Sequence, residues 1–402
     1  MTDKTTCAIV GGGPAGMMAG LILARSGVDV TVFEKHADFL RDFRGDTVHP
    51  STMRLLDELG LLGRFDQIPY SKVETASFPV DGNPVTIVDF RRLRQPHPFV
   101  AMAPQWDFLD MLADAGRVEP HFTLRMQTEV TGLLQDGSKV TGVRYTGPDG
   151  DGELHADLTL ACDGRTSTVR RAAALIPREY PVPFDVWWFR LPRIGDGDYS
   201  LIPRTAPGRA LIMIPRVGYY QIAFLIPKGQ DGPLRSRGMD AFKAELAVMI
   251  PEADLSALTS WDDVKMLNVQ LNRLSTWYRD GLLCIGDAAH AMSPAGGVGV
   301  NVAIQDAAAA ARLLYRPLRE QRLTTTDLAK VQRRRTLPVV ATQAFQRFLH
   351  SRILKPVLAG AAITPPTAML ELFRRIPQLA TLPAYVVGTG LRPEHIPDIA
   401  RR

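Results

Sequence analysis

The stretch VGGGPAG, residues 10–16, decides the fold. It follows a short apolar run, residues 7–10, and opens a helical pattern that closes at Ser26-Gly27, where glycine suits a helix C-terminus. Residues 28–33 then alternate apolar and polar side chains, which predicts a second strand ending before Glu34. A strand, glycine turn, helix and strand in this order predict a Rossmann-type βαβ unit that binds a dinucleotide.

Three glycines and one acid carry this prediction. Gly11 makes the tight turn, Gly13 lets the backbone approach a pyrophosphate, and Gly16 allows close packing of helix on strand. The helix N-terminus offers N–H groups to the phosphates. Glu34 can accept hydrogen bonds from ribose hydroxyls, and its charge disfavours the 2′-phosphate of NADP in this site. NAD and FAD both remain possible for this unit.

Two later turns also place an acid after a strand-like run. Residues 158–162 lead into Asp163-Gly164, and residues 282–285 lead into Gly286-Asp287. Ligands of doubly wound sheets bind at this edge of the strands. Asp287 can bond a ribityl chain, and the glycines of residues 296–299 let helix-end N–H groups approach the electron-rich edge of a flavin. These features favour FAD.

Together, three motifs resemble the single-component (class A) flavoprotein aromatic hydroxylases, the family of p-hydroxybenzoate hydroxylase and the ubiquinone-biosynthesis hydroxylases. The motifs are G-x-G-x-x-G at residues 11–16, C-D-G at residues 162–164, and G-D-A-A-H…P…G-x-G-x-N at residues 286–301. The resemblance implies an α/β fold in which a Rossmann-type FAD-binding domain is interleaved with a mixed β-sheet substrate domain, followed by a C-terminal helical segment.

The resemblance also implies the reaction. NAD(P)H, bound without a second Rossmann unit, reduces FAD, and O2 then forms a flavin C4a-hydroperoxide that hydroxylates a phenolic or heteroaromatic ring. Three alternatives remain open: a flavin oxidoreductase without oxygen insertion, such as a prenyl reductase; a halogenase; and a flavin-binding regulator. Residues 187–192, WWFRLP, do not match the W-x-W-x-I-P stretch of flavin-dependent halogenases. The choice between NADH and NADPH and the identity of the substrate stay undetermined.

Residue roles follow from the same resemblance. Asp287 matches the flavin-ribityl aspartate, residues 299–301 match the segment at the flavin pyrimidine edge, and Pro294 matches a proline between flavin and substrate. Gln105 stands where the family has Arg or Gln near the FAD phosphates. The residues expected to contact FAD are Gly11, Gly13, Pro14, Ala15, Gly16, Glu34, Lys35, Arg41, Arg44, Gln105, Val130, Asp163, Gly164, Gly286, Asp287, Pro294, Gly297, Gly299, Val300 and Asn301. The residues expected at the catalytic centre are Arg44, His49 and Pro294. His290 suits a structural hydrogen bond better than a general base.

The domain organisation is predicted to be discontinuous. Residues 1–72, 97–178 and 270–345 form the FAD-binding domain, residues 73–96 and 179–269 form the substrate-binding sheet, and residues 346–402 form a C-terminal helical cap. Alternation places Trp187 and Phe189 on one face of the antiparallel sheet and Trp188 and Arg190 on the other. Arg190, Arg193 and Arg216 are candidates to anchor a substrate carboxylate, with surface placement as the alternative.

Composition bounds the remaining functions. The 402 residues are 46% hydrophobic and 22% charged, which is typical of a soluble globular protein. The net charge of +5 comes without basic blocks interleaved with aromatics, so nucleic-acid binding is not expected. No metal site is expected, and the three cysteines are too few for a disulfide framework. No apolar run is long enough for a membrane span. We expect a cytoplasmic monomer or homodimer, with peripheral membrane contact by the C-terminal helices as an alternative.

Overall fold

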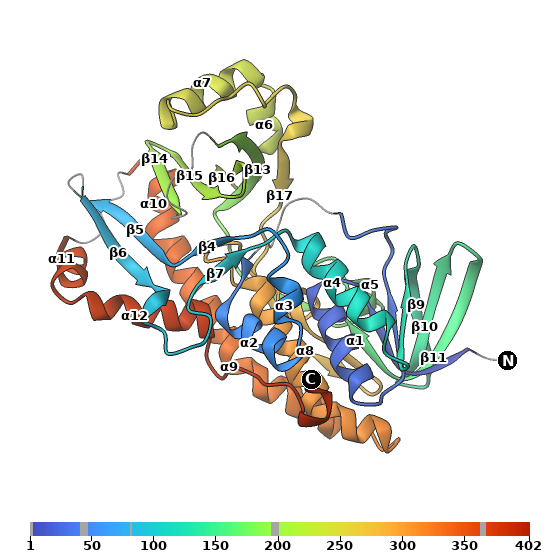
Figure 1. Cartoon of the computed structure of the whole chain (residues 1–402). Coiled ribbons are helices and arrows are strands. Elements are labelled where there is room, and N and C mark those ends of the chain that lie inside the picture. Colours follow the sequence, from blue (N-terminus) through green and yellow to red (C-terminus); the bar gives the residue numbers. More distant parts are fainter. Residues whose placement is uncertain (1–2, 41–46, 81–82, 194–200, 362–366) are drawn as a thin grey trace.

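The computed structural model describes residues 3–40, 47–80, 83–193, 201–361 and 367–402 (Figure 1). An eight-stranded sheet carries the three glycine turns, in the order β19-β20-β11-β1-β2-β8, with β10 and β9 continuing from β11. β20, β11, β1, β2 and β8 run parallel, while β9, β10 and β19 are antiparallel to their neighbours. The bounds are β1 Lys4–Val10, β2 Val30–Phe33, β8 Phe122–Arg125, β9 Glu129–Asp136, β10 Lys139–Gly147, β11 Gly150–Ala161, β19 Tyr278–Arg279 and β20 Leu282–Cys284.

The order of these strands brings the three turns together. β20, β11 and β1 are consecutive neighbours, so the turns after Val10, Ala161 and Cys284 leave the same edge of the sheet. The predicted βαβ unit is therefore confirmed.

Helices from distant parts of the sequence cover this sheet. α1 (Pro14–Arg25) is almost fully buried and contacts both α8 (Gly299–Arg319) and α4 (Gln105–Arg117). α9 (Thr325–Leu349) lies along α8 on the side away from α1 in Figure 1. Around them are α2 Pro50–Glu58, α3 Leu62–Phe65 and α5 Thr168–Ala172.

The second sheet is antiparallel and five-stranded, in the order β14-β15-β16-β13-β17. Its strands are β13 Phe184–Pro192, β14 Ile202–Ala206, β15 Arg209–Pro215, β16 Tyr219–Pro227 and β17 Lys265–Leu267. One face carries Trp187 and Phe189 and packs on Phe242 of α7 (Met239–Met249). The other face carries Val186 and Trp188 and packs on α10 (Lys355–Leu358). The predicted alternation of the two tryptophans is confirmed.

Residues 73–90 do not join that sheet, contrary to the prediction from their strand-like pattern. β5 (Thr75–Val80) and β6 (Asn83–Asp89) form a separate hairpin, connected to the second sheet region by one bridge between Ala76 and Leu201. Pro79 and Pro84 have no N–H to donate, so the hairpin is unsuited to the interior of a larger ladder. A further small sheet orders β3 (Thr47–Val48), β7 (Val100–Met102) and β4 (Ser71–Val73).

The C-terminal part is helical, as expected. α9 passes through the predicted boundary at residues 345 and 346 and continues into a π-helical turn, η4 (His350–Leu354), before α10. No described helix combines the length and apolar character needed to cross a membrane. The remaining elements are η1 Phe90–Arg92, β12 Pro177–Glu179, α6 Asp231–Arg235, η2 Trp261–Asp263, β18 Asn272–Leu274, η3 Gly286–Ala288, α11 Thr367–Arg375, η5 Pro377–Ala380, α12 Thr381–Ala384, η6 Tyr385–Thr389 and η7 Asp398–Ala400.

Candidate functional site

The turn between β1 and α1 leaves space for a ligand at one glycine and none at the other two. Gly11 has a φ of +103°, and a Cβ there would lie 2.5 Å from the carbonyl oxygen of Cys162. A Cβ at Gly16 would lie 1.9 Å from the carbonyl oxygen of Gly11. A Cβ at Gly13, by contrast, would meet nothing within 4 Å. The space beside Gly13, at the N-terminus of α1, is open for a phosphate group.

Glu34 lies directly against this turn. Its carboxylate accepts hydrogen bonds from the backbone N–H groups of Gly12 and His36, both at 3.0 Å, and the side chain is buried. These bonds fix the carboxylate at the end of β2, which is where the βαβ unit places a ribose. Lys35, the next residue, is exposed.

The Asp163-Gly164 turn touches the first glycine turn. A Cβ on Gly11 would lie 3.0 Å from Cα of Asp163. Oδ2 of Asp163 accepts a hydrogen bond from the N–H of Val169 at 3.0 Å, whereas Oδ1 is buried and has no partner among the described residues. Burial raises the pKa of this carboxyl. A buried unsatisfied oxygen costs about 1–3 kcal/mol, so Asp163 is prepared to accept a hydrogen bond from a ligand.

The Gly286-Asp287 turn completes the group. Asp287 Oδ2 accepts a hydrogen bond from Arg165 Nε at 3.0 Å, and both side chains are half-exposed. Arg170 is buried and donates to the carbonyl oxygens of Ala288 at 3.0 Å and Arg165 at 2.6 Å. One arginine therefore holds the second and third turns together.

A buried ionic network supports the third turn from the side of α8. Asp306 Oδ2 accepts from the N–H of Gly286 at 3.1 Å and lies 2.5 Å from His290 Nε2, and Oδ1 accepts from Arg335 Nε at 2.8 Å. Burial alone would raise the pKa of Asp306, but the contacts with His290 and Arg335 outweigh it and hold that pKa below its usual value. The His290 ring also contacts the Trp277 ring at 4.9 Å between centroids. The buried contact with Asp306 agrees with the structural hydrogen bond expected of His290.

Residues 293–301 form the segment expected at the flavin edge. The N–H of Gly297 donates to the carbonyl oxygen of Pro294 at 2.9 Å, which closes a turn immediately before α8. No side chain of the described residues caps α8, so the N–H groups of Gly299 and Val300 are available to an acceptor. The Asn301 side chain points elsewhere, because its Oδ1 accepts from Ser51 at 3.0 Å and Thr52 at 2.7 Å. Asn301 can offer its backbone to a ligand here.

His49 is buried beside this segment and begins α2 as its N-cap residue. Its Nε2 lies 2.9 Å from the carbonyl oxygen of Gly297, and its Nδ1 lies 3.0 Å from that of Val387. Burial lowers the pKa of His49, which favours the neutral ring at pH 7. Because both nitrogens face backbone, His49 acts as a link between two segments in this arrangement.

The other predicted FAD contacts lie outside the three turns. Gln105 is half-buried at the first position of α4, and Val130 is buried in β9. Val130 lies two residues after Thr128, and the N–H of Thr128 donates to the carbonyl oxygen of Glu34. Arg41 and Arg44 lie outside the described residues.

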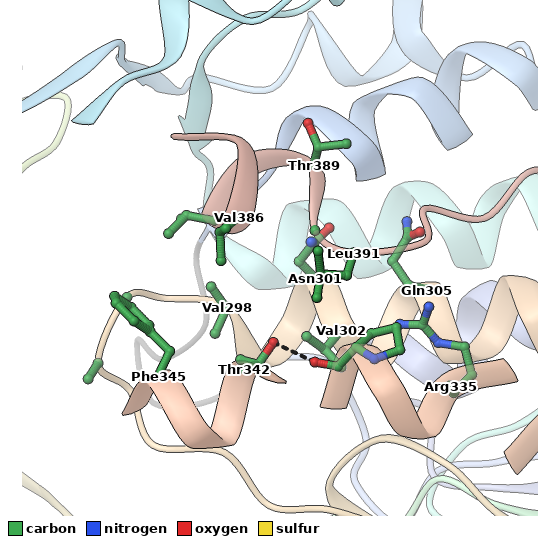
Figure 2. Close-up of a pocket in the computed structure, with 15 residues that line it drawn as sticks. Val298, Asn301, Val302, Gln305, Arg335, Thr342, Phe345, Val386, Thr389 and Leu391 are labelled. Carbon is green, nitrogen blue, oxygen red and sulfur yellow. Dashed lines mark hydrogen bonds between the residues drawn. The ribbon is translucent and has the colours of Figure 1, made fainter. Parts of the chain in front are cut away.

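A hollow of about 530 Å³, open to solvent, is lined in part by Ala295, Gly296 and Val298 of the flavin-edge segment (Figure 2). Asn301 is the predicted FAD contact that lines it, and neither Asp163 nor Asp287 does. Its walls come from α8, α9 and the C-terminal segment, with Val298, Val302, Gln305, Thr342, Phe345, Val386 and Leu391 among the lining residues. The hollow is therefore distinct from the three-turn site.

Sequence reasoning missed the polar residues that hold these turns in place. Arg165 and Arg170 follow the C-D-G motif, Asp306 lies on α8, and Gln343 and Gln346 lie on α9. The spacing of three and four residues from Gln343 through Gln346 to His350 is a signal that could have placed these side chains on one face of the helix.

The geometry fits FAD. Open space at Gly13, an unpartnered Asp163 oxygen and uncapped N-termini of α1 and α8 provide contacts for the phosphates, a hydroxyl and the flavin edge. Among the described residues no cluster of side chains is suited to a metal ion. The fold and site define an FAD-binding oxidoreductase.

Comparison with known proteins agrees with that class. The FAD binding domain family matches residues 4–344. The chain is 33% identical over 382 residues to 6-methylpretetramide 4-monooxygenase from Streptomyces rimosus, covering 91% of this chain and 88% of the relative. It is 25% identical over 346 residues to para-nitrophenol 4-monooxygenase from Pseudomonas sp. (strain WBC-3), covering 81% and 82%. Among solved structures, BexE, studied for oxidation during BE-7585A biosynthesis, superposes with a TM-score of 0.74 at 26% identity, covering 96% of this chain and 76% of BexE.

The chain belongs to the FAD binding domain family, within the class A FAD-dependent aromatic hydroxylases. It is an FAD-dependent aromatic monooxygenase, for which NAD(P)H is the co-substrate typical of the family. The alternative of a flavin oxidoreductase without oxygen insertion is not favoured, because the relatives are monooxygenases.

Proposed function

We propose that this enzyme hydroxylates an uncharged, fused-ring phenol that lies between the Pro294 segment and the five-stranded sheet. The sheet face toward this phenol is the one that carries Val186 and Trp188, called the inner face below. The observation that carries the proposal is the convergence of three turns at one sheet edge, with the first turn of α8 beside them, where a Cβ at Gly286 would lie 3.1 Å from Cβ of Ala303. Bound FAD supplies the redox chemistry and the activation of O2. The 33% identity to an enzyme named for 6-methylpretetramide supports a fused-ring substrate.

The chain's own residues have separate tasks in this proposal. Glu34 and the Gly13 turn bind the adenosine diphosphate part, and Asp163 and Asp287 orient the ribityl chain. The N–H groups of Gly299 and Val300 stabilise negative charge at the flavin edge through the positive end of the α8 dipole. Pro294 fills space beside the ring and excludes water.

The inner face of β13 supports the position of the substrate. At one end of that face, the Phe184 ring lies 5.2 Å from the ring of His350, whose Nε2 is 2.9 Å from Ser293 Oγ. At the other end, the Arg190 guanidinium lies 5.8 Å from the Trp106 ring, next to Gln105. Val186 and Trp188 lie between these ends, so β13 spans the distance between two predicted FAD contacts.

The arginines of this region support an uncharged substrate. The Arg190 guanidinium lies 4.9 Å from the Tyr219 ring, and that of Arg193 lies 5.7 Å from the Tyr220 ring. Arg216 is buried and donates two hydrogen bonds to Gln221 Oε1. Each arginine therefore already has a contact within the chain, and an uncharged substrate would leave these contacts unchanged.

A substrate panel tests this function. FAD-loaded enzyme is given NADH or NADPH and O2 with fused-ring phenols, single-ring phenols or hydroxybenzoates. Fused-ring phenols are expected to stimulate NAD(P)H consumption most and to yield a product heavier by one oxygen atom. Preference for a hydroxybenzoate, or NAD(P)H oxidation with no oxygenated product, would contradict the proposal.

Two adjacent tryptophans provide a matched pair of variants. Trp188→Phe alters the inner face and is expected to raise the KM for the fused-ring substrate, whereas Trp187→Phe alters the face that packs on α7 and should leave that KM unchanged. Equal effects of the two variants would count against the assigned face.

We further propose that the enzyme works in the cytoplasm as a monomer or homodimer. Its domain division is the one given above, except that residues 75–89 form a separate hairpin and α9 runs through the boundary at residues 345 and 346. The alternative is an enzyme that contacts a membrane surface. The exposed side chains of Phe348 and Leu382, in the C-terminal part of the chain, would make that contact. Sedimentation with and without lipid vesicles separates these possibilities.

A further inference from the structure

We propose that Gln343, Gln346 and His350 are positioning residues of the active site, and that α9 holds the segment from Ala291 to Ala295 in the shape that the flavin needs. This inference rests on the proposed function, because it assumes that the Pro294 segment borders the flavin. It assigns a role in the reaction to side chains of a region that the sequence indicates only as a helical cap.

The three side chains share one face of the helix. Their spacing of three and four residues places them in a row along α9 and into its π-helical continuation. All three are at most 2% exposed, whereas Phe345 and Phe348, on the same helical turns, are 40% and 57% exposed. In these last turns, therefore, buried polar side chains face the interior while two phenylalanines face outward.

Gln346 makes three hydrogen bonds to the backbone around Pro294. Its Oε1 accepts from the N–H of Ser293 at 3.1 Å, and its Nε2 donates to the carbonyl oxygens of Ser293 at 2.8 Å and Ala295 at 3.0 Å. Pro294 lies between these two residues and has no N–H of its own. One glutamine therefore fixes both sides of the proline.

Gln343 and His350, on either side of Gln346 in the helix, add further hydrogen-bonding contacts to the same segment. Gln343 Nε2 donates to the carbonyl oxygens of Asn272 at 2.7 Å and Ala291 at 3.2 Å. His350 Nε2 lies 2.9 Å from Ser293 Oγ, which also accepts from the N–H of Ala295 at 3.2 Å. The Ser293 side chain and its backbone N–H and carbonyl are thus all held from α9 or within the turn.

The chemical reason lies in the irregular backbone of this segment. Buried N–H and carbonyl groups outside helices and sheets need partners, and glutamine carries a donor and an acceptor on one side chain. The segment also leads directly to the turn at Gly297 and the uncapped N-terminus of α8. A displacement at Ser293 would therefore move Pro294 and the flavin-edge N–H groups together.

α9 is close to this segment on a second face as well. Pro338, Thr342 and Phe345 line the same hollow as Ala295, Gly296 and Val298. Thr342 Oγ1 donates to the carbonyl oxygen of Pro338 at 2.9 Å (Figure 2). Residues of α9 therefore line the hollow next to this segment and also form hydrogen bonds to it at Ser293.

The test compares two glutamines of the same helix. Gln332 also binds backbone on both sides of its amide, accepting from the N–H of Trp277 at 3.0 Å and donating to the carbonyl oxygen of Ser275 at 2.8 Å, but away from the Pro294 segment. Gln346→Leu and Gln332→Leu therefore remove the same kind of contact from one helix. Amide hydrogen exchange of the FAD-free full-length chain is measured first, followed by the FAD-loaded enzyme.

We expect Gln346→Leu to speed amide exchange in residues 291–297 by about tenfold or more, as loss of such hydrogen bonds implies. The loaded variant should show a shifted visible flavin spectrum and release more hydrogen peroxide per NAD(P)H oxidised. Gln332→Leu should change none of these, although it lowers the melting temperature. Wild-type exchange and spectrum in Gln346→Leu, or identical changes in both variants, would overturn the proposal.

A second variant covers the case in which Gln346→Leu does not fold. Gln346→Glu keeps the acceptor for Ser293 N–H but presents a carboxylate to two carbonyl oxygens, so Ser293 should stay protected while peroxide release rises. Normal coupling in this variant would also overturn the proposal. If wild-type chain binds no FAD, the proposed function fails, while the exchange comparison still decides whether α9 orders the segment.

Discussion

Arg165 Nε donates a hydrogen bond to Asp287 Oδ2 at 3.0 Å, joining the turn after β11 to the turn after β20. The two side chains are 28% and 30% exposed, so the pair is open to solvent and to a ligand. An exposed pair of this kind contributes at most about 1 kcal/mol. A ligand hydroxyl can therefore share or replace the arginine at little cost.

Asp287→Ala is expected to weaken FAD binding by about 10- to 100-fold, because a hydrogen bond to a charged group contributes about 1.5–3 kcal/mol. Fluorescence titration of FAD measures the change. Glu252→Ala is the control, since it breaks another Arg–carboxylate pair of 3.0 Å, formed with Arg204 of β14. A variant that keeps stoichiometric yellow colour after dilution would remove Asp287 from the site.

Gly13→Ala is expected to weaken FAD binding without lowering stability, whereas Gly16→Ala is expected to lower the stability of the fold. Gly13 has φ and ψ of −77° and −175°, which any residue can adopt, and open space for a Cβ. The FAD-free variant should melt as wild type, with FAD affinity about tenfold lower or worse because the methyl occupies the phosphate position. Gly16→Ala should cost about 1–3 kcal/mol of stability by overpacking against Gly11. Unchanged FAD affinity in Gly13→Ala would place the phosphates elsewhere.

Arg44→Ala tests the role predicted for Arg44, which lies outside the described residues. The resemblance places Arg44 near the flavin, so the variant is expected to slow flavin reduction by NAD(P)H more than it weakens FAD binding. Rapid mixing under anaerobic conditions measures the reduction rate at full FAD occupancy. Reduction at the wild-type rate would contradict this role.

His350 should make stability depend on pH. Burial lowers the pKa of His350 to about 4, so the folded state favours the neutral ring. Its contribution is complete above the unfolded pKa near 6.5 and is lost as pH falls toward 4. Between pH 7 and pH 5, wild type should lose about 2 kcal/mol more unfolding free energy than His350→Gln, measured by denaturant titration. Equal losses would show that the ring charges freely in the fold.

The βαβ unit and both later acid turns could be predicted because each lies in one short stretch with fixed spacing. The alternation of Trp187 and Trp188 was also readable, since a strand has a period of two. The hairpin of residues 75–89 was not, because alternation indicates a strand without naming its partner. The hydrogen bonds from Gln346 to Ser293 and Ala295 were not either, since they join segments about fifty residues apart through side chains that any helix can carry.

His49 faces two carbonyl oxygens, those of Gly297 and Val387, with one nitrogen each. A neutral imidazole carries one ring proton, so only one of these oxygens receives it at a time, while the other meets a lone pair. In one tautomer the ring donates to the Gly297 oxygen before α8 and its lone pair repels the Val387 oxygen in η6. In the other tautomer the two interactions are exchanged. A change of tautomer in this one ring, in which one nitrogen loses a proton and the other gains one, redistributes the hold on the two segments.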